Sequence, residues 1–550
     1  MSTELQAGTK RSERRLVLAI FLATFSAFLL TSGRERPWGD GNVQYMVTES
    51  LVEHHSLDIP RPWPDDLPPG RNGKFYSTYP ILTSVVQIPG KLLLEGISHA
   101  APKARRFALP LTSHLACSFF GALCCLLFYG LCRQRRLSIA AASIGTAVLA
   151  FATTIWVYAH YSYSEIAQAA FVTGFILELL RTAEAPTPRR ARWLGLWAGL
   201  LFSVKYIYAA SLIGGGIWLA LRLRGQWRLL GRLTAWAAVT AVPFLIVALI
   251  YNWLCWGSPF VTGYTPYFHV YWGENILFGL WGMFLSPGKS VFLYSPPLIL
   301  GLLALPLLWR EHRDYLAAVG LVAGLVLLVY ARYKLNGDYA WGPRFVVFAV
   351  PLFGFSFAAL FDRWRRRLSR PTRAVVAGFV LLGVGVNVLG NALYWDHYIR
   401  ISMDARDAWL GKPNRRGAII PVRADGHCDS CFEDVRQLEW LPPFQPILGH
   451  LWLLESLARG DNWKRAEAHA PWHRYTKLQL NISRSYPRAR LDWWGMLWIK
   501  DFPAYQFPGI LLLLLFVAGT GLGAAGWIRA HRALVRGAHE DDPDDAPANA

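Results

Sequence analysis

Charged and polar side chains in this chain gather where its hydrophobic segments end. The carboxylates among them are Asp40, Glu49 and Glu165. A charge at membrane depth is costly, so such a residue is usually paired or functional. Cations there suit a phosphate, and a carboxylate beside them suits removal of a proton from an incoming hydroxyl or amine. The plainer interpretation is that each charge anchors a helix end or pairs with another charge. The candidates for phosphate binding are Lys74, Tyr79, Lys205, Lys289, Arg332, Lys334 and Arg344, and Asp338 lies in the same stretch as the last three.

The elements that must position these side chains are transmembrane helices. Hydrophobic residues make up 53% of the 550 residues and charged residues 17%. Apolar runs near the roughly 20 residues that cross a bilayer recur along most of the chain. The net charge of +20 comes from short basic loops, which is the pattern that orients membrane helices and no sign of nucleic-acid binding. We therefore predict an all-α polytopic membrane protein.

Placing every basic loop on the cytoplasmic side gives a bundle of about twelve transmembrane helices with both termini in the cytoplasm. Two loops on the outer side are too long to be simple connectors. The second of them is polar and rich in Trp, Tyr and Arg, and we expect it to form a small mixed α/β periplasmic domain or cap. The predicted divisions are a cytoplasmic start over 1–15, a transmembrane module over 16–393 with its first outer loop over 33–104, the domain over 394–505, a last span over 506–528 and a disordered cytoplasmic tail over 529–550.

Two stretches look like functional motifs but do not carry their chemistry. Cys428 and Cys431 form a lone C-x-x-C, for which a local disulfide is favoured over zinc or redox chemistry. The stretch "GMFLSPGKS" has five residues between Gly282 and Gly288, where a phosphate-binding loop needs four, so nucleotide hydrolysis is unsupported. We predict no cofactor, and the sequence contains no identified set of ligands for a divalent metal.

The order of the polar segments resembles the GT-C superfamily of polyprenyl-phosphate-sugar glycosyltransferases, especially the branch with protein O-mannosyltransferases and the lipid A aminoarabinose transferase. The resemblance rests on "GDGNVQYMVTESLVEHHSLDI" just after the first span, followed by "NGKFYSTYPIL", and on "GDYAWGPRFVVFAVPLFGF" further along. Two positions depart from the pattern. The acid that often follows the catalytic Asp is replaced by Gly41, and the cation nearest to the Tyr-Pro pair is Lys74.

The resemblance implies a glycosyltransferase of the bacterial inner membrane that transfers a hexose or a pentose with inversion at the anomeric carbon. The donor would be a polyprenyl-phosphate sugar, and the acceptor would be a glycan, a lipid or a protein. Membrane lipids would surround the protein. Asp40 would be the general base, with Lys or Arg side chains on the phosphate. Two other classes remain open, a transporter or flippase of a lipid-linked or anionic substrate and a membrane scaffold. Trp272, Trp341, Trp493 and Trp494 could provide faces for a sugar or pack at the interface.

Overall fold

Helices form the regular structure of the computed structural model, which describes residues 2–37, 39–60, 69–265, 272–334, 340–365, 368–409, 438–473, 490–501 and 506–540. No strand occurs within these ranges, where only isolated β-bridges such as Leu393–Leu491 are found. The prediction of an all-α membrane protein is confirmed. Asp338, Cys428 and Cys431 lie outside the described residues.

Seven helices of the described chain are long and apolar enough to cross a membrane. The prediction of about twelve spans is not confirmed, because several apolar runs are divided into short helices, among them α6 (Ile139–Phe151) and α7 (Ile155–Tyr158). The seven are α5 (Arg105–Gln134), α8 (Glu165–Glu184), α11 (Trp227–Trp256), α17 (Arg313–Ala331), η6 with α18 (Arg344–Ala349 and Val350–Trp364), α19 (Arg370–Ala392) and α25 (Gln506–Glu540).

Helix α8 lies at the centre of the bundle. Its side chains are buried along nearly its whole length, including polar Gln168 and Thr173. Helices α11 and α25 are at the outside, since most of their apolar side chains are exposed. A helix that is apolar on every side belongs in the interior, and exposed apolar helix faces are what a surrounding bilayer covers. The centre of the bundle is therefore protein and its rim faces lipid.

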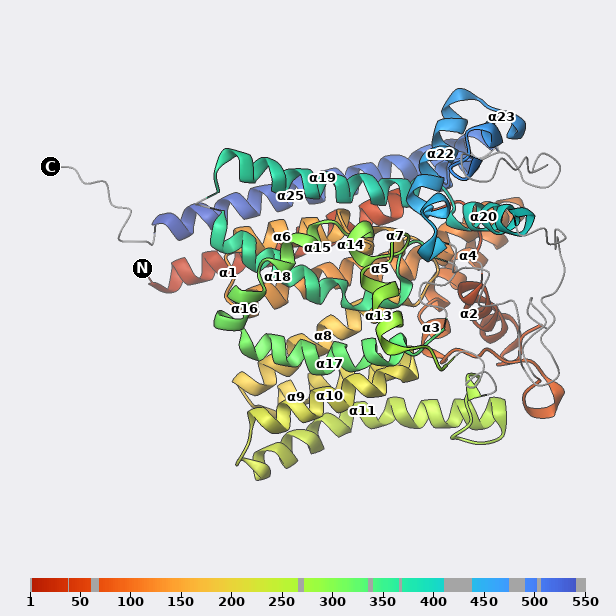
Figure 1. The fold of residues 1–550 in the computed structure, drawn as a ribbon. Coiled ribbons are helices and arrows are strands. Elements are labelled where there is room, and N and C mark those ends of the chain that lie inside the picture. The colour runs from red at the N-terminus through yellow and green to blue at the C-terminus, as the bar shows by residue number, and fades with distance from the viewer. Residues whose placement is uncertain are drawn as a thin grey trace.

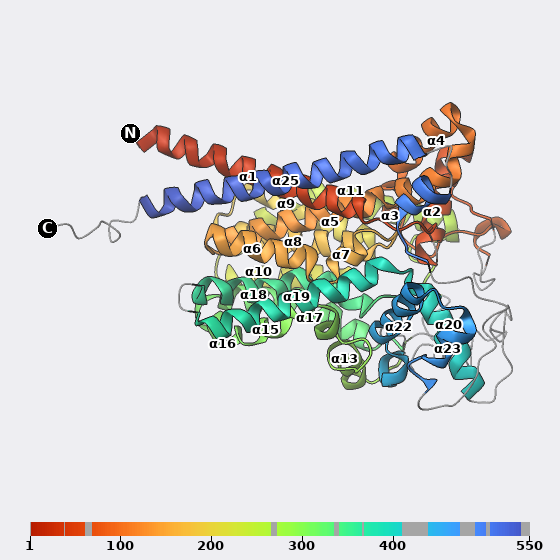
Figure 2. The same cartoon turned by 90° about the horizontal axis from the view of Figure 1, so that it is seen from above.

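The first and last helices run side by side, α1 (Ser2–Leu30) against α25, and the start of α1 and the end of α25 lie at the same end of the bundle (Figures 1 and 2). Small residues allow the close approach. A Cβ at Gly519 would lie 2.4 Å from Ser26 Oγ, and one at Gly523 would lie 2.4 Å from the Ala23 nitrogen. Glycines four residues apart on one helix face are a common means of bringing membrane helices into backbone contact.

The opposite end of the bundle, called the Asp40 end below, is covered by shorter helices (Figures 1 and 2). They come from the two long loops identified in the sequence. The described parts of 394–505 are helical, so the strands predicted for a mixed α/β domain are not found in those parts. The covering helices are α2 (Asp40–Glu49), α3 (Leu82–Val85), α4 (Ile88–Ala100), α20 (Trp395–Trp409), α22 (Pro446–Arg459) and α23 (Trp463–Ala468).

The segment 492–494 fastens the end of α1. A helix end leaves carbonyl groups without partners, and here the Trp493 indole donates to the Leu30 carbonyl at 2.7 Å and the Trp494 indole to the Leu29 carbonyl at 2.9 Å. Asp492 accepts from the Arg34 backbone N–H at 2.7 Å and from the Tyr161 hydroxyl at 3.0 Å. These bonds fix the chain between α1 and α2, which leads directly to Asp40.

Burial raises the pKa of Asp492 from 3.8 to about 6, although it accepts hydrogen bonds from Arg34 and Tyr161. Because the folded state holds this proton more tightly than the unfolded state, the stability it provides is present below about pH 4 and is lost as the pH rises to about 6. Asp492→Asn should remove this loss, making the variant more stable than the parent at neutral pH by about 3 kcal/mol but not in acid. Thermal unfolding in detergent on both sides of this range measures the difference, with the exposed Asp314→Asn as control. Equal effects in acid and at neutrality would contradict the assignment.

Candidate active site

Arg344 joins two predicted carboxylates that are far apart in the sequence. Its Nε lies 2.8 Å from Glu165 Oε1, and its Nη2 donates to Asp40 Oδ2. The side chains of Arg344 and Glu165 are only 3% and 2% exposed, whereas that of Asp40 is 26% exposed. One carboxylate of the pair is therefore buried within the bundle, and the other is open to an incoming molecule.

Each of these three residues is the first residue of a helix at the Asp40 end. Asp40 begins α2, Glu165 begins α8, and Arg344 begins η6. The positive end of the helix dipole stabilises the two carboxylates in this position but disfavours a cation. The two carboxylates offset that cost for Arg344. The start of α8 and the start of η6 are packed together, which explains how residues 165 and 344 meet.

The two glycines that flank Asp40 explain the sequence "GDG". Gly39 has φ 54° and ψ −131°, which residues with a Cβ rarely adopt. A Cβ at Gly41 would lie 2.1 Å from the Ser162 carbonyl oxygen. Helix α2 therefore begins in direct contact with the segment that precedes Glu165. The acid that the resemblance leads one to expect at position 41 has no room in this packing.

Tyr79 is the second partner of Asp40. Its hydroxyl donates a hydrogen bond to the carboxylate, and its backbone carbonyl accepts one from the Tyr251 hydroxyl at 3.4 Å. Burial alone would raise the pKa of Asp40, but the charge of Arg344 and the hydrogen bonds from Tyr79 and Arg344 outweigh it and hold the pKa below its usual value. Asp40 is therefore ionised at neutral pH.

Lys205 provides a second cation beside this group. It follows α9 (Pro188–Val204), where the chain becomes extended before η4 (Tyr206–Tyr208). Its Nζ lies 5.3 Å from the ring centre of Tyr330 and 5.1 Å from that of Phe345, whose ring is also 5.7 Å from the Arg344 guanidinium. Within the described chain, Lys205 forms no ion pair with a carboxylate. A cation in contact with aromatic rings and lacking a counter-ion is suited to bind an anion.

Aromatic residues that the sequence analysis did not single out complete the site. The Tyr163 ring lies 4.6 Å from the Arg344 guanidinium. Tyr264 packs edge-on against Tyr79 at 6.0 Å, and its buried hydroxyl has no hydrogen-bond partner in the described part of the chain. Tyr163 stands two residues before Glu165 in the sequence and could have been found from that candidate. Tyr264 is far in the sequence from every candidate catalytic or phosphate-binding residue.

Glu49 belongs to a different group. It lies at the far end of α2, where its Oε1 is 3.3 Å from Lys91 Nζ and 3.8 Å from Arg105 Nη2. Glu53 and Glu95 surround the same two cations, and the Lys91 side chain is fully buried. The structure thus brings Glu49 into an ion-pair network that fastens α2 to α4 and α5. It does not bring Glu49 to Asp40.

Four of the predicted phosphate-binding residues lie apart from Asp40. Lys74 is 53% exposed and pairs with Asp58 at 3.1 Å. Lys289 is buried and donates to the Ala340 carbonyl at 3.1 Å, which supports the chain before Arg344. The exposed Arg332 directly follows α17, and its carbonyl accepts hydrogen bonds from the backbone N–H groups of Gly273 and Glu274. The Lys334 side chain lies beside Gly273.

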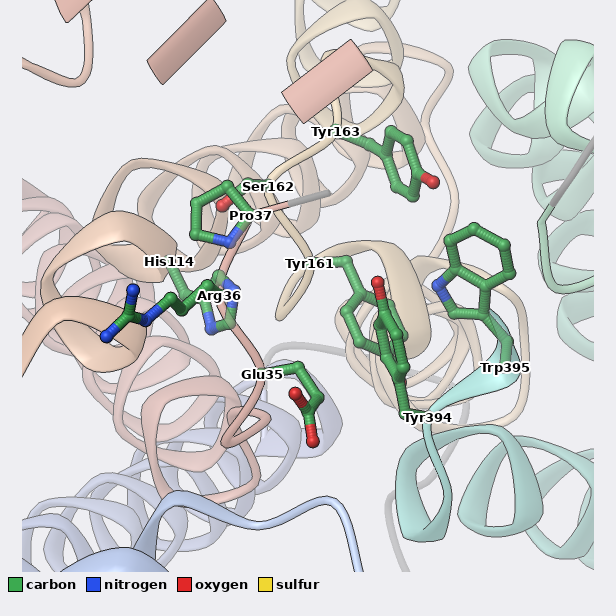
Figure 3. A pocket seen from close by; sticks show the side chains of 9 residues that line it. All are labelled: Glu35, Arg36, Pro37, His114, Tyr161, Ser162, Tyr163, Tyr394 and Trp395. Carbon is green, nitrogen blue, oxygen red and sulfur yellow. The ribbon is translucent and has the colours of Figure 1, made fainter. Parts of the chain in front are cut away.

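The predicted tryptophan faces are mostly used in packing. Trp341 and Trp494 are 1% and 0% exposed, and Trp493 and Trp494 bond to the end of α1. Beside the site, a small hollow opens next to Tyr163, where that ring lies 5.9 Å from the ring of Trp395 (Figure 3). The hollow is lined by Glu35, Arg36, Pro37, His114, Tyr161, Ser162, Tyr163, Tyr394 and Trp395.

Among the residues that the structure describes, no group of three or more His, Cys, Asp or Glu could hold a metal ion.

Removing the shared cation should strongly destabilise the fold. Arg344→Gln leaves the buried Glu165 without a counter-charge, and breaking a buried ion pair from one side costs about 3–5 kcal/mol. Adding Glu165→Gln should recover part of this loss, because the uncompensated charge is then gone. Unfolding of detergent-purified variants measures both values, with Lys74→Gln, at an exposed ion pair, as the control. A double variant as unstable as the sum of both single variants would argue against the direct pair.

No protein-family model and no curated protein matches the chain. Two solved structures of ArnT from Cupriavidus metallidurans are similar to it. The structure bound to undecaprenyl phosphate has a TM-score of 0.43 and 16% identity, covering 95% of this chain and 78% of that one. The apo structure has a TM-score of 0.40 and 15% identity, covering 97% and 79%. At these scores and identities the likeness carries no argument about the function of this chain.

Proposed function

We propose that this chain is a membrane glycosyltransferase that moves a sugar from a polyprenyl-phosphate donor to an acceptor at the Asp40 end, on the periplasmic side of the inner membrane. The observation that carries the proposal is the arrangement around Arg344: an open carboxylate, Asp40, lies within contact of one cation and close to a second, Lys205. A base and an anion site are thus adjacent at the end of a bundle whose rim faces lipid.

The two cations are suited to the leaving group of such a reaction. A sugar on a polyprenyl phosphate departs as lipid phosphate, so negative charge grows on the phosphate oxygens as the sugar leaves. Fixed positive groups aimed at developing charge are usually the largest single contribution to catalysis. Lys205 and Arg344 are both held against the Phe345 ring, which keeps them in place before the donor arrives.

Asp40 accepts the proton of the nucleophile in this reaction. An acceptor hydroxyl or amine of a glycan, lipid or protein gives its proton to the Asp40 carboxylate as it bonds to the anomeric carbon of the sugar. The bond from that carbon to the phosphate oxygen breaks, and its electron pair stays on the oxygen of the departing lipid phosphate. This single displacement inverts the configuration at the anomeric carbon. It requires no second carboxylate as a nucleophile or an acid, because the phosphate is a good leaving group.

Asp40→Asn tests the base. The amide keeps the shape and most hydrogen bonds but cannot take a proton, so transfer should fall by the ~10²–10⁴ expected for loss of general-base catalysis while donor binding is largely kept. The measurement is transfer from a labelled polyprenyl-phosphate sugar to membrane extracts. Asp58→Asn, in the same loop but paired with Lys74, is the matched control. Full activity in Asp40→Asn would exclude Asp40 as the base, and flux of substrate without any glycosylated product would indicate a transporter.

Lys205→Gln tests the anion site. A lost charge-assisted contact to the donor phosphate is worth enough to weaken donor binding by roughly tenfold or more. Binding of a labelled polyprenyl phosphate to the purified variant measures this effect, at low and at high salt. Lys74→Gln removes an equal charge from an exposed lysine of the same end and should leave binding unchanged. Equal binding to both variants would remove Lys205 from the phosphate site.

A further inference from the structure

The ion pair between Asp40 and Arg344 makes Asp40 a weak general base. An ion-paired carboxylate is correctly ionised, but it takes up a proton poorly because doing so breaks the pair. General bases are most effective when their proton affinity suits the working pH. In the described part of the chain, the charged and titratable groups that face Asp40 include Arg344, Tyr79, Lys205 and Tyr264. Of these, Arg344 exerts the largest electrostatic effect on the carboxylate.

Glu165 offers Arg344 an alternative bond. The guanidinium is a flat fork in which Nε and Nη2 point to the same side and can bind both oxygens of one carboxylate. Nε already lies 2.8 Å from Glu165 Oε1. Glu165 Oε2 is buried and has no hydrogen-bond partner in the described part of the chain. Nη2 thus has two acceptors available to it, Asp40 Oδ2, which it occupies, and Glu165 Oε2.

We propose that Glu165 is a positioning residue that takes Nη2 of Arg344 from Asp40 when the anionic donor binds, and so releases the Asp40 carboxylate to accept the proton of the acceptor. This inference rests on the proposed function. Glu165 is 2% exposed and lies behind Arg344, so it acts through the arginine and touches no reacting atom. It is therefore not a second general base.

The donor provides the reason for the exchange. A phosphodiester brings a negative charge to Lys205 and Arg344, next to Asp40, so two anions compete for the same guanidinium. Turning Nη2 toward Glu165 gives the arginine two parallel bonds to one carboxylate. The Tyr163 ring, 4.6 Å away, supports the flat face of the guanidinium during this turn. Asp40 then loses its main counter-charge while a like charge approaches, and both changes raise its proton affinity.

Proton uptake on binding tests the exchange without any transfer. The probe is a polyprenyl methyl phosphate diester, which has one negative charge and no sugar. Calorimetric titration in buffers of different ionisation enthalpy measures the protons taken up per bound diester. The parent protein should take up a fraction of a proton at about pH 5 and almost none at about pH 7.5, because the approaching phosphate raises the proton affinity of Asp40 and a carboxylate is refilled only in the lower range.

Variants identify the groups responsible. Asp40→Asn should bind the diester without uptake, and Glu165→Gln should bind it with uptake reduced several-fold, because no anionic oxygen draws Nη2 away. Glu178→Gln is the matched control, since Glu178 lies on the same helix and pairs with Arg181 at 2.7 Å. Glu165→Asp keeps the charge but is one methylene shorter, so its two oxygens cannot both reach the guanidinium. It provides a folded alternative and should also show reduced uptake.

The outcomes separate the two proposals. A parent protein that binds the diester with no uptake, or a Glu165→Gln protein with undiminished uptake, overturns the exchange and leaves the proposed function standing. A diester that does not bind overturns the phosphate site and the exchange with it. In transfer assays, the acid limb of kcat should lie at higher pH than that of kcat/KM for the donor, and the two limbs should coincide in Glu165→Gln. A purely structural role for Glu165 would lower the rates without moving either limb.

Discussion

A single buried guanidinium shared by two carboxylates is the constraint on which this site depends. A cation at this depth is too costly to stand alone, so Arg344 requires both Asp40 and Glu165, and they in turn require it. Together the three groups carry one net negative charge, and Lys205 places a further positive charge beside them. A phosphate that arrives beside the two cations therefore competes with the carboxylates for Arg344, and the bond that yields is the one to the more exposed carboxylate.

The frame around the guanidinium is built from helix starts. The central helix α8 and the buried helix that starts with η6 both begin at the same level of the bundle. Their first residues, Glu165 and Arg344, therefore lie side by side. Helix α2 is attached from outside, with Gly41 against the Ser162 carbonyl and with Lys91 and Arg105 holding its far end. Contacts at both ends of α2 thus place Asp40 beside Arg344, although Asp40 is partly exposed.

Charge cost alone drew attention to three residues that the structure brings together. Asp40, Glu165 and Arg344 stood out because a charge at membrane depth is costly and is usually paired or functional, and the structure joins them through Arg344. The same argument also selected Glu49, but it could not show that Glu49 pairs with Lys91, because only the folding of α4 onto α2 brings the two together. Hydropathy predicts how many apolar runs are long enough to cross a membrane. It does not predict where such a run is divided into short helices, as it is between α6 and α7. Trp- and Tyr-rich sequence in 394–505 favours strands by propensity, yet tertiary packing in the described parts selects helices.

The contact between α1 and α25 has a consequence for how the protein is made. About 480 residues separate the end of α1 from the start of α25, so at ~5–20 residues per second a ribosome needs roughly half a minute to a minute and a half to supply the second after the first. During that time the face of α1 around Ala23 lacks its partner helix α25. The backbone carbonyls of Leu29 and Leu30 likewise lack the indole N–H groups of Trp493 and Trp494 that later bind them. Assembly around Asp40 is thus one of the last events of biogenesis, and a chain that stalls before this point remains in the membrane unfinished and recognisable to quality control.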